Sequence, residues 1–320
     1  MGKLNRLLLL PLALLLMVPL ASAASAKNGG YITAAYDNVK CLTDFEDSVI
    51  GSITGAVPQA SGLSASADKL TSDTSTLQGY AAGGDAEGFR SFLRGTYEPD
   101  VTAANQAIRD ARKSYRDWNV SASTRASLKA SFNESQATLS SCRAASLGEA
   151  GQARVKGYQD TLAEYGAKAD NLSAKGIDAS GMRDAISSAQ STIVAPLQAA
   201  LASATTPQEM RAALGGYCLA NGCANGTNDH FYAKFDGAKL QAILDYVKPN
   251  ATAAGLGAQV SQAQSDIDAA QAALNSVGTF KYDPSNEKAV WDGLKDAATQ
   301  MKSILKGMRA PAGGNRTGSK

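Results

Sequence analysis

Apolar residues recur at alternating steps of three and four along almost the whole chain. The run Tyr97, Val101, Ala104, Ile108, Ala111, Tyr115 and Trp118 is one example, and Leu128, Phe132, Ser135, Leu139 and Cys142 form another. This spacing places the residues on one face of a helix, and no stretch alternates at a period of two as a half-buried strand does. The pattern predicts an all-α protein, built as an elongated antiparallel helical bundle or as coiled-coil hairpins of Ala-rich, heptad-patterned helices.

Caps and breaks divide the pattern into separate helices. Thr206-Pro207-Gln208-Glu209 is a capping box with proline at the first helical position, and Asp85 and Asp283-Pro284 also mark helix starts. Glycines predict turns or helix ends at 83–84, 148, 151, 176, 215–216 and 255. The predicted helices span 29–55, 64–82, 85–118, 121–146, 149–173, 179–203, 206–216, 229–248, 257–275 and 284–309. Pro99 and Pro196 predict a kink or a split within two of these helices.

The length of the chain fits one long bundle or two smaller ones. If there are two, the division is expected near Gly148, with a first half at 24–147 and a second half at 148–310. Residues 311–320 are polar and rich in glycine, and we expect them to form a disordered tail.

The first 23 residues have the order of a secretory signal peptide. Lys3 and Arg6 precede an apolar run from Leu7 to Leu20, and Ala21-Ser22-Ala23 offers a cleavage site. A second site follows at residue 26. The alternative of a membrane anchor is less favoured, because the run is shorter than the ~20 residues that span a bilayer. We therefore expect a secreted or cell-surface protein with no membrane span after cleavage.

Charge argues against nucleic acid as a partner. The chain has 31 basic and 29 acidic residues, and the mature chain is neutral once Lys3 and Arg6 are removed. Basic residues without acidic neighbours gather only after Asp296, at Lys302, Lys306, Arg309, Arg316 and Lys320. A basic helix end running into a tail explains them best; the alternative is a contact with an anionic surface polymer.

The four cysteines predict two disulfides. Cys218 and Cys223 flank a short loop and are expected to pair locally, which leaves Cys41 with Cys142. The heptad position of Cys142 predicts that it faces a neighbouring helix. The competing interpretation, a metal site that uses the cysteines and the single histidine, His230, lacks a second close pair of ligands.

Six Asn-x-Ser/Thr sequons are candidate glycosylation sites: Asn119, Asn133, Asn171, Asn225, Asn250 and Asn315. Their number favours use in a secretory route over chance in a Ser-rich chain.

The sequence carries no recognisable catalytic motif. It has neither a Gly-x-Ser-x-Gly elbow nor a phosphate-binding Gly-x-x-x-x-Gly-Lys-Ser/Thr loop. Acidic residues at 37, 44, 46 and 47 suggest a cation site, but a solvated helix face beside the apolar stripe explains them better. The irregular segment 215–235 holds the candidate ligand-binding residues Tyr217, His230 and Tyr232, although core packing of its aromatics is the stronger interpretation.

These observations favour a scaffold or interaction protein without catalytic activity, metal or cofactor, whose partners are other extracellular or cell-surface proteins. The alternative is a module that binds carbohydrate or a surface polymer through the 215–235 loop. An extracellular enzyme is the least favoured class.

Overall fold

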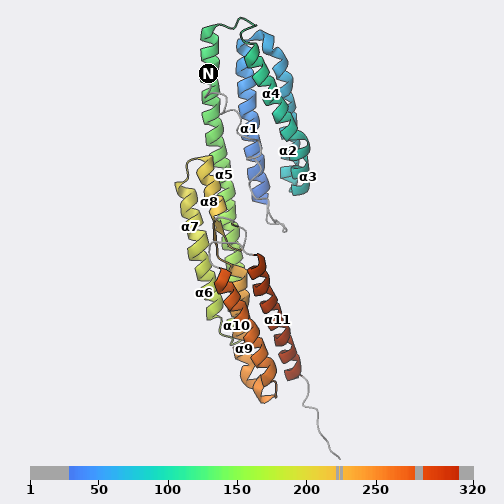
Figure 1. Ribbon diagram of the computed structural model, residues 1–320, viewed down its shortest axis with the longest axis vertical. Helices are drawn as coiled ribbons and strands as arrows, with labels where there is room; N and C mark the ends of the chain where they lie inside the picture. Colours follow the sequence, from blue (N-terminus) through green and yellow to red (C-terminus); the bar gives the residue numbers. More distant parts are fainter. Residues whose placement is uncertain (1–28, 221–222, 224–225, 278–283, 310–320) are drawn as a thin grey trace, which may run out of the picture. The chain divides into compact units, whose positions relative to one another are not determined.

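A computed structural model describes residues 29–220, 223, 226–277 and 284–309, and within them the chain is almost entirely helical (Figure 1). The prediction of an all-α helical bundle is confirmed. The elements are α1 (Gly29–Ala56), a 3-10 helix η2 (Pro58–Leu63), α2 (Ser64–Gly83), α3 (Ala86–Phe92), a π turn η3 (Leu93–Tyr97), α4 (Glu98–Ser114), α5 (Ala122–Ser173), α6 (Ser180–Ala189), a π turn η4 (Gln190–Val194), α7 (Ala195–Ser203), α8 (Pro207–Gly216), β1 (Tyr217–Cys218), β2 (Thr227–Asn228), α9 (Phe231–Ala253), α10 (Gly257–Val277) and α11 (Pro284–Arg309).

Some sequence predictions fall outside these residues. They are the leader at 1–23, the tail at 311–320, and the sequons Asn225 and Asn315. None of the described helices combines the length and the apolarity that a membrane crossing requires.

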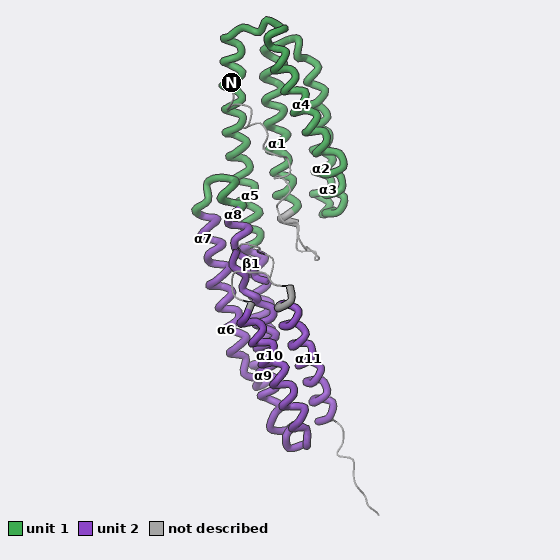
Figure 2. Tube along the Cα trace, in the orientation of Figure 1, with its two compact units in different colours: residues 1–154, 203–211 green, residues 155–202, 212–320 purple. Residues whose placement is uncertain are grey.

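The chain forms two compact units, coloured separately in Figure 2. Unit 1 comprises residues 1–154 and 203–211, and unit 2 comprises residues 155–202 and 212–320. The boundary therefore lies inside α5, between Arg154 and Val155, and the segment 203–211 joins the first unit although it follows part of the second in sequence.

The prediction of a helix break near Gly148 is wrong, because α5 continues from Ala122 to Ser173 through both Gly148 and Gly151. Neither glycine has the positive φ angle that ends a helix, in contrast to Gly84, Gly176 and Gly255. Glycine inside a helix costs only about 0.5–1 kcal/mol relative to alanine. The buried neighbours Leu147 and Ala150 offset this cost through packing.

The core of unit 1 lies between α1, α2 and α4, which pack against one another. One cluster joins Val39 and Leu42 of α1 to Leu70 and Leu77 of α2. A second cluster contains Val49 and Ile53 of α1 together with Ile108 of α4 and Tyr115, which directly follows α4. Ile108 and Tyr115 belong to the predicted stripe that runs from Tyr97 to Trp118, and the helical periodicity correctly identified its buried face.

The core of unit 2 is built by α9, α10 and α11, with α6 packed against α9. Leu244 of α9, Ile267 of α10 and Ile304 of α11 are fully buried and belong to one core cluster. Along α10 and α11 the buried residues continue at steps of three and four, from Val260 to Ala270 and from Val290 to Ile304.

Pro99 and Pro196 are each accommodated by a π turn that ends two residues earlier, at Tyr97 and Val194. In both places the buried residues follow each other at steps of four: Phe89, Leu93, Tyr97 and Val101 in the first, and Ala185, Ala189, Ile193, Leu197 and Leu201 in the second. A regular α-helix has 3.6 residues per turn, so such a run would drift around the helix. The wider π turn takes up this drift.

The predicted caps at Asp85 and Thr206 are present, and the third, Asp283, lies outside the described residues. Asp85 accepts a hydrogen bond from the Gly88 N–H at 2.9 Å. In the capping box, the Glu209 N–H donates to Thr206 Oγ1 at 3.2 Å, and the Thr206 N–H donates to Glu209 Oε2 at 3.0 Å. These bonds satisfy N–H groups that have no partner within the helix.

Candidate functional site

The first candidate site lies where α5 meets α1 in unit 1. On α1, the residues Cys41, Phe45, Ser48 and Ser52 follow one another at steps of four, three and four and line one face. Cys41 is joined to Cys142 of α5 with their Cα atoms 5.8 Å apart, as predicted. Ser48 and Ser135 are 2.9 Å apart through their hydroxyls. These pairs fix the face that α1 turns toward α5.

This seam is thinly packed, because serines occupy positions where a bundle usually has large apolar side chains. Phe45 and Phe132 meet edge to face across the seam with their ring centroids 5.8 Å apart. Between Ala122 and Ser141 of α5, only Ser135 is buried. Much of this part of α5 is therefore open to solvent although a disulfide ties it to α1.

The polar hollow beside the disulfide has a volume of about 340 Å³. Five hydroxyl side chains line it, Ser48, Ser52, Ser131, Ser135 and Thr138, beside the apolar Phe45 and Leu139. Two carboxylates, Asp44 and Glu134, also line it. Asp44 forms an exposed ion pair with Lys40 at 2.7 Å, whereas Glu134 forms none with another described residue.

A second hollow of about 260 Å³ opens further along the same seam and shares only Ser52 with the first. Its charged lining is entirely basic: Arg112, Arg125 and Lys129. Apart from Ser52, the remaining walls are apolar or aromatic: Val49, Ile53, Tyr115, Leu128 and Phe132. The two hollows therefore differ in the sign of their charge. We call the second one the cationic pocket.

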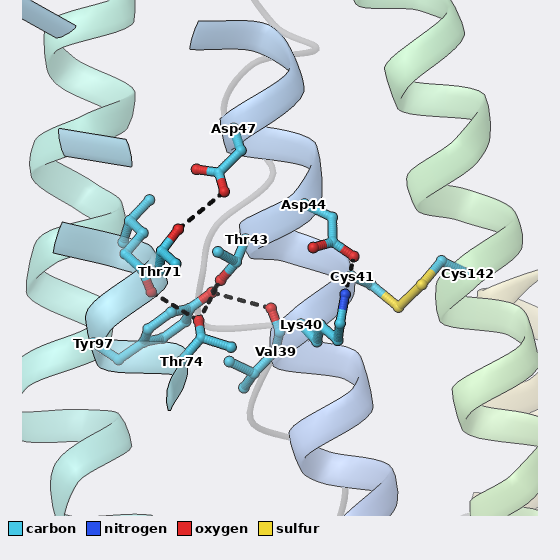
Figure 3. A network of polar contacts seen from close by, with 11 residues as sticks. Val39, Lys40, Cys41, Thr43, Asp44, Asp47, Thr71, Thr74, Tyr97 and Cys142 are labelled. Atoms are coloured by element: carbon cyan, nitrogen blue, oxygen red, sulfur yellow. Dashed lines mark hydrogen bonds and ion pairs between the residues drawn. A yellow bond between two sulfur atoms is a disulfide. The ribbon is translucent and has the colours of Figure 1, made fainter. Parts of the chain in front are cut away.

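A buried polar network lies on the opposite face of α1 (Figure 3). The hydroxyls of Thr43 and Thr74 are 2.7 Å apart, and those of Thr43 and Tyr97 are 2.9 Å apart. Tyr97 donates to the Val39 carbonyl at 3.1 Å. Burial raises the pKa of the Tyr97 hydroxyl, which therefore remains a neutral donor. The network joins α1 to α2 and to the π turn η3, which ends at Tyr97, and its satisfied bonds indicate a structural role.

Glu46 corrects the interpretation of the acidic residues 37, 44, 46 and 47 as a solvated helix face. Its side chain is only 1% exposed, and Oε1 accepts a hydrogen bond from Asn105 Nδ2 at 2.8 Å. Its Oε2 has no hydrogen-bond partner among the described residues. Burial raises the pKa of Glu46 to about 7, more strongly than Asn105, Arg109 and Arg143 lower it. Helical periodicity missed this residue because Glu46 adjoins the apolar stripe and α4 covers it.

The second candidate site is the 215–235 segment of unit 2. The predicted disulfide between Cys218 and Cys223 is present, with a Cα separation of 5.7 Å. Tyr217–Cys218 pairs in parallel with Thr227–Asn228, and these two-residue strands are the only β structure among the described residues. The buried Asn228 side chain accepts from the Cys223 N–H at 3.0 Å and donates to the Cys223 carbonyl at 2.9 Å. The loop is thus held by both covalent and polar bonds.

Asp229 anchors the same segment to its neighbours. Its buried Oδ2 accepts hydrogen bonds from Ser188 at 3.2 Å and from Thr192 at 2.8 Å, and it pairs with Lys234 Nζ at 2.9 Å. Ser188 and Thr192 belong to α6 and η4, and Lys234 belongs to α9. The next residue, His230, adopts a left-handed conformation (φ 58°) and precedes α9.

The three candidate binding residues of this loop do not converge. His230 and Tyr232 line a small hollow with Trp291, but Tyr217 does not. This hollow measures about 30 Å³, which is roughly the share of liquid volume that one water takes. Tyr232 also packs edge to face on Tyr165, 5.7 Å between centroids. The geometry favours packing over ligand binding at this loop.

The sequons that the structure describes lie at the surface. Asn119, Asn133, Asn171 and Asn250 are all exposed, and glycosylation requires this. Asn119 has a positive φ of 51°, a conformation that asparagine tolerates in turns. Their glycosylation stays a prediction. Within the described residues, no three His, Cys, Asp or Glu side chains gather as metal ligands would.

Comparison of the chain with known protein families, with curated proteins and with solved structures finds no match. The fold and its sites therefore define the chain only as an all-α helical bundle protein with two disulfides.

Proposed function

We propose that this protein is an exported, non-catalytic helical scaffold that binds other extracellular or cell-surface proteins through the polar hollow between α1 and α5. One observation carries the proposal. The first half of α5 is tied to α1 by Cys41–Cys142, yet it leaves a hollow of about 340 Å³ and keeps most of its own surface exposed. A helix that is covalently positioned but incompletely packed offers a rigid surface with little ordering cost on binding.

Export is supported by the leader pattern at 1–23 and by the two disulfides, which persist in oxidising compartments. Use of the exposed sequons would add glycans to the same molecule. Neither feature requires a catalytic centre.

The chemistry of the hollow favours a polar partner segment that carries a basic side chain. Its hydroxyls both donate and accept hydrogen bonds, so they match main-chain and side-chain amides. Glu134 has no ion pair with another described residue, and a lysine or arginine of the partner would provide one.

Two matched variants on α5 test this proposal. Ser131→Trp would fill the hollow, because Ser131 lines it, whereas Ser127→Trp adds the same ring at an exposed position outside it. Each form would be expressed in the native host as the full-length chain with its leader, and complexes of the disulfide-bonded protein would be purified from the medium and the cell envelope and quantified.

We expect a stoichiometric protein partner with the unmodified chain and with Ser127→Trp, and a loss of at least tenfold with Ser131→Trp. Retention of the whole protein in the cytoplasm would contradict export. Equal recovery of the partner with both variants would contradict the assignment of the hollow.

A further inference from the structure

The cationic pocket of unit 1 is not explained by the scaffold function. Its basic side chains come from two different helices, since Arg112 belongs to α4 and both Arg125 and Lys129 belong to α5. No acidic residue lines it. The chain as a whole is almost balanced in charge, with 31 basic and 29 acidic residues, so a local group of three cations without a carboxylate stands out.

No acidic side chain neutralises the three cations of the pocket. Some basic residues, such as Lys69, Lys113 and Lys156, pair with an aspartate within 3 Å, whereas others, such as Arg116 and Lys295, form no ion pair with another described residue. Within the described residues, Arg112, Arg125 and Lys129 form no ion pair. An anion placed among them would gain from all three charges.

Arg112 is also held in place. Its guanidinium carbon lies 5.4 Å from the centroid of the Phe132 ring, within the range of a cation–π contact. A guanidinium held in this way loses less conformational freedom when it binds a carboxylate.

The other walls of the pocket are apolar. Val49 and Ile53 are almost fully buried, and Leu128 and Phe132 are half-buried. Burial raises the pKa of Tyr115, so its hydroxyl stays protonated and can donate. Apolar walls with a few convergent polar groups are typical of small-molecule sites.

We propose that the cationic pocket binds a medium-chain organic monocarboxylate, with the carboxylate at Arg112, Arg125 and Lys129 and the chain on the apolar walls. The volume limits the ligand, since 260 Å³ holds about nine groups of water size. A chain of eight to ten carbons is of this order. The polar hollow next to it has two carboxylates and no cation, so it would repel the same ligand.

Decanoate is the probe for this proposal, and isothermal titration calorimetry of the mature, disulfide-bonded protein is the measurement. Three other ligands separate the contributions: acetate has the charge without the chain, decanol has the chain without the charge, and decyltrimethylammonium reverses the charge. We expect saturable binding of decanoate, at least tenfold weaker binding of the other three, and a negative heat-capacity change from apolar burial.

Arg125→Gln and Lys129→Gln remove one charge each from the pocket, and Arg116→Gln removes a charge from an exposed position outside it. Each pocket variant should weaken decanoate binding about tenfold or more, and Arg116→Gln should leave it unchanged. Circular dichroism of each variant checks its fold. Equal losses in all three variants, equal affinity for acetate, or equal affinity for decyltrimethylammonium would overturn the proposal, as would the absence of saturable decanoate binding.

Discussion

Cys41 and Cys142 face each other across the seam of α1 and α5, with their Cα atoms 5.8 Å apart. Seven residues further along α1 and seven residues back along α5, the hydroxyls of Ser48 and Ser135 are 2.9 Å apart. Both pairs therefore belong to one antiparallel register. Seven residues correspond to two helical turns, or about 10.5 Å, so the two links define a line of contact along the helices.

Replacing both cysteines, as Cys41→Ser with Cys142→Ser, should destabilise unit 1 by about 4–5 kcal/mol. The disulfide closes a loop with a sequence separation of 101 residues, and the entropy lost by the unfolded chain grows with loop length. Urea unfolding followed by circular dichroism measures the change.

The pair Cys218→Ser with Cys223→Ser is the matched control, because its bridge spans a sequence separation of only 5. The same model predicts a loss of about 2 kcal/mol for so short a loop. A larger loss for this pair than for Cys41 with Cys142 would contradict the loop-length argument.

Glu46→Gln should remove a pH dependence of the stability of unit 1. The pKa of Glu46 is raised to about 7 in the folded protein from 4.5, so the folded state binds more protons between these values. The free energy of unfolding therefore falls as pH rises from about 4.5 to 7, by up to about 3 kcal/mol. Glutamine keeps an oxygen that can accept from Asn105 and carries no charge to bury.

Urea denaturation at pH 5 and pH 8 measures this difference. Unmodified protein should lose stability between these pH values, and Glu46→Gln should lose much less. Glu134→Gln, at an exposed position of α5, serves as the control and should behave like the unmodified protein. Identical pH profiles for Glu46→Gln and the unmodified chain would refute the assignment.

Lys234→Met should destabilise unit 2 by about 2–3 kcal/mol. It leaves the buried Asp229 carboxylate, whose side chain is 1% exposed, without its cation. Breaking a buried pair typically costs about 3–5 kcal/mol, and the 34% exposure of Lys234 reduces this value.

Lys288→Met is the comparison, because Lys288 and Asp292 form an ion pair in which both side chains are exposed. Such pairs contribute about 0–1 kcal/mol. Chemical denaturation of both variants should rank them clearly, and a similar small loss for both would contradict the role of Asp229 as an anchor.

The mature protein should begin at Ala24 or Lys27, after the small residues that end the leader pattern. N-terminal sequencing of protein purified from the native host checks this prediction. A native start at Met1 or Gly2 would contradict the proposal of export.

Local signals in the sequence predicted the helices well. Asp85 and Thr206 cap helices where expected, and Gly84, Gly176 and Gly255 have the positive φ angles that end them. These features depend on residues close in the chain, so sequence alone contains the necessary information. The disulfide partners also followed from sequence, because one short loop left a single remaining pair.

Other features depended on contacts between distant residues. Gly148 does not end a helix, because packing around Leu147 and Ala150 outweighs the local preference of glycine. The hollows along α5 could not be predicted from the sequence either. A serine at a heptad position, such as Ser135, does not show how much space remains beside it once the helices pack. The wrong interpretation of Glu46 has the same origin, because α4 covers a position next to the stripe.

The sequence by itself therefore determined the helical class, most helix ends and the cysteine pairs, because periodicity, caps and loop length are local properties. Only the tertiary structure decided which polar residues are buried and where space remains between helices. Burial and cavity volume arise from side chains of separate helices together, as at Glu46 with Asn105 and at Arg112 with Phe132.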